Sequence, residues 1–143
     1  MLIQQISVFV ENKQGRLREV TNVLGAAGID IRALSIADTS DFGILRMIVD
    51  KPEKAVALFK ENRIMASITE VIGAGLDDKP GALSHVLDVL AGVGISVEYI
   101  DAFITRSARD AYVILRVEDN ETAAEALTKA GIRLLEANEV CGI

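Results

Sequence analysis

Aliphatic side chains recur at every second position over residues 6–10, where Ile6, Val8 and Val10 alternate with Ser7 and Phe9, and this period of two is typical of a strand. Between Leu17 and Ala27 the apolar positions instead recur at helical spacing, which predicts a helix. Gly28 follows directly, and glycine commonly ends helices. The chain is therefore expected to begin with a strand and a helix.

Strands and helices continue to alternate after this helix. Pro52 marks the start of a second helix, because proline is favoured at a first helical position. The expected order is strand, turn, strand, helix and strand, at residues 29–37, 38–41, 42–49, 53–61 and 64–72. The first half of the chain thus predicts the order βαββαβ, the split-βαβ arrangement of ferredoxin-like domains.

The second half of the chain repeats the first. Residues 11–31 align without a gap with residues 77–97, at an offset of 66. A four-residue insertion around residues 106–110 then increases the offset to 70. The repeat predicts the same elements in the second copy, at residues 72–76, 83–93, 95–105, 111–118, 122–130 and 134–140. Asp119 or Asn120 is expected to cap the last helix.

The duplication predicts an α+β chain of two small domains, at residues 1–70 and 71–143. Each is expected to be a ferredoxin-like βαββαβ unit with an antiparallel four-stranded sheet and its helices on one face. Units of this size are marginally stable alone, so the copies are expected to stabilise each other or to pair with another chain. Little sequence separates the copies, and residues 68–76 are expected to run as nearly one strand.

The third strand of each copy is apolar on both faces, although helices cover only one face of each predicted sheet. An uncovered apolar face usually marks an interaction surface, so a homodimer is expected, packed sheet to sheet or edge to edge. In the second copy Gly73 and Gly75 take the places of Ser7 and Phe9 on this face. These glycines predict that another element approaches closely there.

Composition excludes several functional classes. Half of the 143 residues are hydrophobic and the formal net charge is −6, as in a folded chain. Acidic and basic residues balance in the first copy, so the whole net charge of −6 lies in the second copy, and nucleic acid is not an expected partner. Neither a membrane span nor a signal peptide is expected. The single cysteine, Cys141, excludes an internal disulfide and fits a cytoplasmic protein.

Catalytic and metal-binding chemistry is sparse. His85 is the one histidine, and its neighbours place it on an exposed helix face, so neither a metal site nor a cofactor is expected. No P-loop, paired-carboxylate site or nucleophile elbow is present. Arg46 and Arg116 hold equivalent places in the third strands. They either pair across the sheet, with Asp30, Glu98 or Asp101 as candidates, or contact a ligand carboxylate; the pairing is favoured.

The connection between the first strand and the first helix of each copy carries the most suggestive chemistry. Its glycines, Gly15 and Gly81, permit a tight turn and close approach of a ligand. The helix behind each glycine offers unpaired N–H groups to a carboxylate, and Asn12 or Asp78 could meet an ammonium group. The loop would suit a zwitterion. The alternative, favoured by spacing alone, is that Asn12 and Asp78 only form local turns that cap the helix.

Each half of the chain resembles an ACT domain, the small ligand-binding regulatory module of many enzymes of amino-acid metabolism. The matching signature is Asx-Lys-x-Gly-x-Leu, an amphipathic helix and then Gly-Ile-x-Ile/Val, at residues 12–17 with 28–31 and at residues 78–83 with 94–97. Residues 33–46 are similar to the stand-alone tandem-ACT proteins of prokaryotes. The resemblance covers essentially the whole chain.

In that family the effector, typically an amino acid, is bound between ACT units by this loop and by the start of the second strand. By position, the resemblance implies these ligand-binding residues: Asn12, Gln14, Gly15, Arg16, Leu17, Asp30 and Ile31 in the first copy, and Asp78, Pro80, Gly81, Ala82, Leu83, Ser96 and Val97 in the second. Gln14 departs from the usual proline, and Asp30 and Ser96 from the common asparagine. The two sites are therefore expected to differ in affinity or ligand, or one of them serves only the interface.

Taken with the resemblance, the sequence favours a non-catalytic amino-acid-binding regulator whose ligand shifts a packing or partner equilibrium. One alternative is a dedicated regulatory subunit of an amino-acid biosynthetic enzyme. A less favoured one is a small ferredoxin-like enzyme such as an acylphosphatase. That enzyme would need an arginine beside the first strand to hold a phosphate; Arg16 is available in the first copy, but Ala82 takes its place in the second.

Overall fold

The computed structural model describes residues 2–38, 41–104 and 110–141, and it divides the chain into two compact units. The first unit contains residues 4–69, and the second contains residues 70–141 together with residues 2 and 3. Parts of the predicted turn at 38–41 and of the insertion at 106–110 lie outside the described residues, as does the side chain of Cys141.

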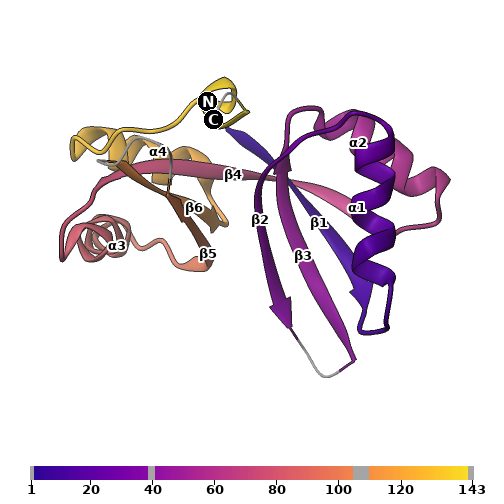
Figure 1. The fold of residues 1–143 in the computed structure, drawn as a ribbon. Coiled ribbons are helices and arrows are strands. Elements are labelled where there is room, and N and C mark those ends of the chain that lie inside the picture. Colours follow the sequence, from indigo (N-terminus) through magenta and orange to yellow (C-terminus); the bar gives the residue numbers. More distant parts are fainter. Residues whose placement is uncertain (1, 39–40, 105–109, 142–143) are drawn as a thin grey trace. The chain divides into compact units, whose positions relative to one another are not determined.

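The first unit follows the predicted order of elements (Figure 1). Its elements are β1 (Ile3–Glu11), α1 (Arg16–Ala26), β2 (Ile31–Asp38), β3 (Phe42–Val49), α2 (Pro52–Glu61) and the first part of β4 (Ala66–Asp77). Strand β3 pairs antiparallel with both β1 and β2. As predicted, Pro52 is the first residue of its helix.

One face of this sheet carries the core of the first unit. Val8 lies opposite Leu45 in the register of β1 and β3, and Ile6 lies opposite Met47. All four side chains are buried. Helices α1 and α2 pack side by side (Figure 1). They add buried apolar side chains to the same core: Val20, Leu24, Ala55 and Phe59.

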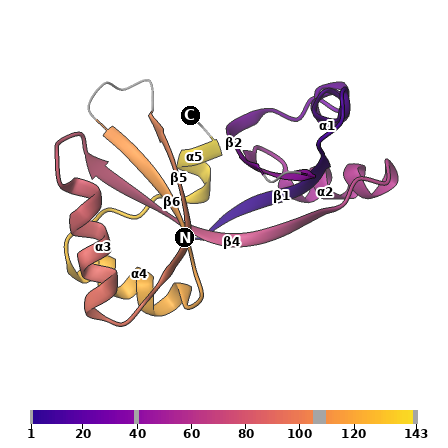
Figure 2. The same ribbon diagram turned by 90° about the horizontal axis from the view of Figure 1, so that it is seen from below.

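The second unit repeats this plan up to its last element (Figure 2). It contains the rest of β4, then α3 (Ala82–Gly92), β5 (Val97–Ile104), β6 (Asp110–Val117), α4 (Asn120–Lys129) and α5 (Ala137–Cys141). Strand β6 pairs with β4 and β5, and α3 and α4 lie side by side. Asp119 caps α4, since its carboxylate accepts a hydrogen bond from the Thr122 N–H at 3.1 Å.

The predicted last strand over residues 134–140 is wrong beyond its beginning. Leu134 forms a single antiparallel bridge to Ala74, and the chain then enters α5. The Glu139 carboxylate accepts a hydrogen bond from the Glu136 N–H at 2.6 Å. This contact from the first turn of a helix back to its cap is half of a capping box. It favours a helix over residues 137–141, although the equivalent part of the first copy is a strand.

The strands form one six-stranded sheet in the order β2-β3-β1-β4-β6-β5, so the prediction of two separate four-stranded sheets is wrong. The cause is β4, which runs without interruption from residue 66 to residue 77. This confirms the nearly continuous strand predicted for residues 68–76. Because β4 is the last strand of one repeat and the first strand of the next, the strands of both repeats join in one sheet.

Gly73 confirms the predicted close approach to the outer face of the second unit. A Cβ atom at this position would lie 2.6 Å from Ile3 Cδ1 and 3.1 Å from Leu135 Cβ, inside van der Waals contact. Ile3 and Leu135 are both buried. A Cβ atom at Gly75 would lie 3.6 Å from Arg133, an ordinary contact, so packing requires the glycine at position 73 and not at 75.

Substitution Gly73→Ala is expected to lower the free energy of unfolding by about 1–3 kcal/mol, because the added methyl group overpacks the contact with Ile3 and Leu135. The matched control is Gly25→Ala in α1, where the methyl group would meet no atom within 4 Å. Alanine is the better helix former, so this control should stabilise the protein by about 0.5–1 kcal/mol. Urea unfolding measures both; a Gly73→Ala variant as stable as the wild type contradicts this account of the packing.

Candidate functional site

The loop between β1 and α1 has the same backbone geometry as the loop between β4 and α3. In the first, the Lys13 N–H donates to the Glu11 carbonyl at 2.7 Å, and the Arg16 N–H donates to the Lys13 carbonyl at 3.3 Å. The equivalent bonds from Lys79 and Ala82 measure 2.8 and 3.3 Å. Backbone hydrogen bonds therefore form both turns without help from a side chain.

A glycine in the left-handed region ends each turn. Gly15 has a φ of 86° and Gly81 a φ of 89°, values that favour glycine. Each glycine directly precedes its helix, and neither helix has a side-chain cap. The alternative that Asn12 and Asp78 cap the helices is therefore wrong, because the backbone closes the turn alone. Both side chains are exposed.

The start of α1 offers hydrogen-bond donors to a bound group. The first bond within the helix is donated by the Glu19 N–H to the Gly15 carbonyl at 3.0 Å. The N–H groups of Leu17 and Arg18 precede it and have no acceptor within the helix, and the helix dipole favours an anion there. A small cavity of about 130 Å³ adjoins this loop, and its lining residues are Val10, Glu11, Asn12, Lys13, Leu17, Ile36, Gly43 and Leu45.

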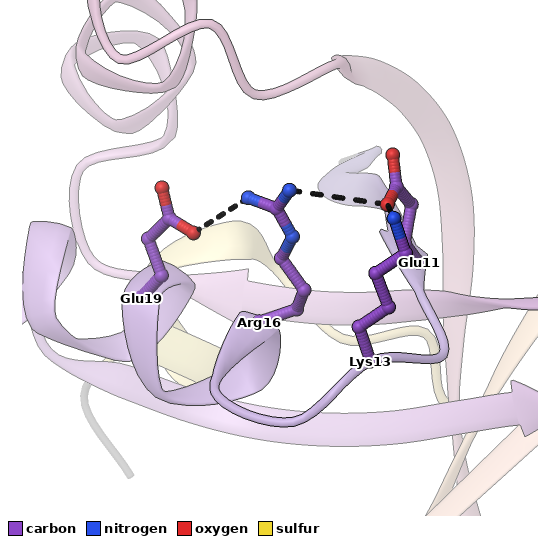
Figure 3. Close-up of polar contacts among 4 residues, drawn as sticks. All are labelled: Glu11, Lys13, Arg16 and Glu19. Carbon is purple, nitrogen blue, oxygen red and sulfur yellow. Dashed lines mark hydrogen bonds and ion pairs between the residues drawn. The ribbon is translucent and has the colours of Figure 1, made fainter.

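The charged side chains of the first loop neutralise one another (Figure 3). Lys13 Nζ lies 3.0 Å from Glu11 Oε2. The Arg16 guanidinium lies between two carboxylates, 3.0 Å from Glu19 and 3.9 Å from Glu11. The hydrogen bond from Lys13, followed by the charges of Lys13 and Arg16, holds the pKa of Glu11 below its usual value. An arginine engaged by two carboxylates is poorly placed to hold a phosphate, which argues against the acylphosphatase interpretation.

The second loop has a different charge arrangement. Lys79 Nζ lies 3.9 Å from Asp77, and Ala82 stands where the first loop has its arginine. A cavity of about 650 Å³ opens beside this loop, and the predicted residues Pro80, Gly81 and Ala82 line it. The pairing found in the first loop is therefore reduced to one long contact in the second.

The same cavity includes three residues that the sequence pattern does not assign to a site: His85, Tyr112 and Arg133. His85 is exposed, as predicted. Arg133 donates to the Tyr112 hydroxyl at 3.2 Å. The position of Arg133 follows from its neighbour Leu134, which forms a bridge to Ala74 of β4. Local periodicity does not reveal a pairing between residues so distant in sequence.

The start of β2 is separate from the loop that precedes α1. Helix α1 has eleven residues and is about 16 Å long at 1.5 Å per residue; Gly15 precedes its start and Asp30 follows its end. Asp30 Oδ2 pairs with Arg32 at 3.2 Å, and the Asp30 N–H donates to the Asp50 carboxylate at 3.0 Å. Ile31, the other residue expected here, packs against the core of the first unit.

The second unit has the same arrangement. Ser96 is exposed, and Val97 packs against the core. Arg116 Nε pairs with Glu98 at 3.3 Å, which confirms the predicted pairing across the sheet for this arginine. The exposed members of the predicted loops are Asn12, Gln14, Gly15, Arg16, Leu17, Asp78, Pro80, Gly81 and Leu83. Within one unit, the loop and the start of the second strand are thus two separate places.

Among residues 2–38, 41–104 and 110–141, no three His, Cys, Asp or Glu side chains come together as a metal site would require. None of the helices described is both long and apolar enough to cross a membrane.

Comparison with known proteins relates the whole chain to one family. The family model described as an ACT domain pair matches residues 1–143. The chain is 39% identical to the protein BT0572 from Bacteroides thetaiotaomicron, whose crystal structure superposes with a TM-score of 0.94 over 100% of this chain and 98% of that one. No curated protein matches the chain.

Two more distant structures share the fold. The regulatory subunit of aspartate kinase from Thermus thermophilus, in its ligand-free form, is 19% identical with a TM-score of 0.65, over 90% of this chain and 93% of that one. The regulatory subunit of aspartate kinase from Thermus flavus is 17% identical with a TM-score of 0.63, over 92% and 94%. At these identities the likeness concerns the fold alone.

An NMR titration is expected to give the Glu11 carboxyl group a pKa below that of an ordinary glutamate. In Lys13→Gln this pKa should rise towards the ordinary value, and in Arg16→Gln it should rise less, because Lys13 supplies both the hydrogen bond and the closer charge. A lowered pKa means that the pairing stabilises the loop at neutral pH and that this contribution is lost as the pH falls through the lowered value. A Glu11 pKa that does not respond to Lys13→Gln contradicts the network.

Proposed function

The chain belongs to the family of ACT domain pairs, and we propose that it is a non-catalytic regulatory protein that binds an amino acid. The observation that carries the proposal is the pair of exposed loops, each with a glycine turn directly before a helix that lacks a side-chain cap. Such a loop presents N–H donors to a carboxylate, and its acidic and amide side chains present acceptors to an ammonium group.

In this proposal the first N–H groups of α1 hold the carboxylate of the effector, and Asn12 holds its ammonium group. Asp78 has the same role before α3. The starts of the second strands, residues 30–31 and 96–97, contact the effector from a neighbouring ACT unit. In this proposal the contact does not come from the same unit, because α1, about 16 Å long, lies between the loop and the start of the second strand.

The small cavity at the first loop supports a shared site. Its volume of about 130 Å³ is below the roughly 300–1,000 Å³ of typical small-molecule pockets. Leu17 and Ile36 line it and are 42% and 54% exposed, and Leu34 on the same edge strand is 51% exposed. A second copy packed on β2 would cover these side chains and enlarge the site, so the proposal includes a homodimer.

A second candidate function is that of a dedicated regulatory subunit of an amino-acid biosynthetic enzyme. The likeness in fold to two aspartate kinase regulatory subunits favours it. Stoichiometric copurification with a larger enzyme distinguishes a subunit from a stand-alone regulator. Both candidates place the protein in the cytoplasm, which a chain with one cysteine suits.

At least one common amino acid at millimolar concentration is expected to raise the melting temperature, because a ligand at ten times its Kd stabilises by about 1.4 kcal/mol. In calorimetry, Asn12→Ala and Asp78→Ala should each weaken binding. Lys60→Ala, an exposed change at the end of α2, is the control and should leave binding unchanged. The absence of stabilisation by any amino acid contradicts the function, and unchanged binding in both loop variants contradicts the site.

Sedimentation equilibrium is expected to show a dimer that Ile36→Lys dissociates, because the lysine would place a charge on the apolar edge. Val93→Lys changes an equally apolar and 47% exposed side chain at the end of α3, and this control should leave the dimer intact. A wild-type protein that remains monomeric at high concentration rules out the homodimer.

A further inference from the structure

A second cavity of the first unit has an open apolar wall. Its volume of about 430 Å³ is in the range of ordinary small-molecule pockets, roughly 300–1,000 Å³. Phe9, Phe42 and Met65 line it, although they are 47%, 45% and 70% exposed. The two rings lie 6.4 Å apart at an angle of 59°. Three large apolar side chains exposed around one cavity form a surface that favours an apolar ligand.

Arg63 lines the same cavity in a strained backbone conformation. Its φ of 58° is the one positive value at a non-glycine residue among the residues described, and an L side chain is unfavourable there. The equivalent residue of the second unit is Gly131, with a φ of 79°. Both residues follow the second helix of their unit and donate their N–H to the carbonyl three residues earlier. A glycine thus makes this turn without strain in one copy, while the other copy keeps an arginine.

Arg63 is also the unbalanced cation of the cavity. Glu11, Arg16 and Glu19 line the cavity as well, but they pair with one another and with Lys13 (Figure 3). Arg63 is exposed and forms no ion pair in the part of the chain that the structure describes. A guanidinium without a carboxylate partner is available to an anionic ligand.

We propose that this cavity binds a small carboxylate that carries a large apolar side chain. Arg63 holds the carboxylate, since a guanidinium binds that group with two parallel hydrogen bonds. Phe9, Phe42 and Met65 hold the side chain through ring and thioether contacts. An α-amino acid and its 2-oxo acid share this chemistry. The site adjoins the one at Asn12 in the proposed function and shares Val10 and Glu11 with it, but Arg63 and the apolar wall belong to this cavity alone.

The amino acid has one advantage over the 2-oxo acid. The ion pairs of Arg16 use Oε2 of both Glu11 and Glu19. The Oε1 atoms of these two carboxylates remain to accept hydrogen bonds from an ammonium group. A ligand that has this group would gain a charge-assisted contact that a keto group cannot make.

The second unit lacks this site. Gly75 and Arg133 take the places of Phe9 and Met65, because in both units the N–H of the first residue donates to the carbonyl of the second, at 2.8 and 3.1 Å. Arg133 is engaged with Tyr112, both with its hydroxyl at 3.2 Å and with its ring at 6.0 Å. The apolar wall is therefore absent there, and one site per chain follows.

Calorimetry on the full chain tests the site with phenylalanine and leucine, with their 2-oxo acids, and with alanine as a small control. Phenylalanine or leucine is expected to bind at one site per chain, and alanine is not. Weaker binding of the 2-oxo acids supports contacts of the ammonium group with Glu11 and Glu19. Equal binding of both forms supports recognition by Arg63 and the apolar wall alone.

The decisive variant is Arg63→Gly. It should weaken binding about ten- to a hundredfold, as the loss of a charged hydrogen bond does. It should also raise the melting temperature of the ligand-free protein, because glycine relieves the positive φ. An arginine with a merely structural role would not give both results. Phe9→Ala should weaken binding too, whereas Arg133→Gln, the control in the second unit, should not.

Unchanged binding in Arg63→Gly, or no binding of phenylalanine, leucine and their 2-oxo acids, overturns this site. The proposed function survives that result if another amino acid binds in a way that depends on Asn12, and it fails as well if no amino acid binds. If Phe9→Ala changes the sedimentation coefficient and leaves ligand binding unchanged, the apolar wall is a protein interface, and the site is likewise overturned.

Discussion

The continuous backbone hydrogen bonding of β4 is the constraint on which the rest of the structure depends. Residues 71–74, in the middle of this strand, are buried, and buried N–H and C=O groups must have partners. The strand therefore cannot break where one repeat ends and the next begins. It serves both repeats, which joins their strands in one sheet. It also leaves no room for a side chain at Gly73, where Ile3 and Leu135 cover the strand.

The two repeats share a backbone and differ in chemistry. Their loops before α1 and α3 form the same turn, because backbone hydrogen bonds and one glycine suffice for it. The neighbouring side chains were free to diverge. The first unit has a neutral network around Arg16 and exposes Phe9 and Phe42 beside Arg63. In the second unit Arg133 binds Tyr112, and a short helix replaces the end of the last strand. A duplicated chain can thus offer two different surfaces on one framework.

Much of the fold and part of the candidate site could be predicted from the sequence. Periodicity located the helices and strands, and Gly15 and Gly81 marked the turns that precede the helices, because only local backbone preferences are involved. The last strand of the second copy was wrongly expected from the repeat, because the hydrogen bond from the Glu136 N–H to the Glu139 carboxylate favours a helix there. The role of Asn12 as a cap was wrong because the backbone alone closes its turn.

The sequence by itself determined the repeated βαββα order and the family, since both depend on patterns of residues that lie close together along the chain. The tertiary structure decided which residues meet. Arg63 and Met65 lie beside Phe9 because the Phe9 N–H donates to the Met65 carbonyl at 3.1 Å, and strand pairing of this kind joins residues that are distant in sequence. It also decided that the strands form one sheet. Local preferences carry no information about such contacts, because the pairing follows from burial of the whole core.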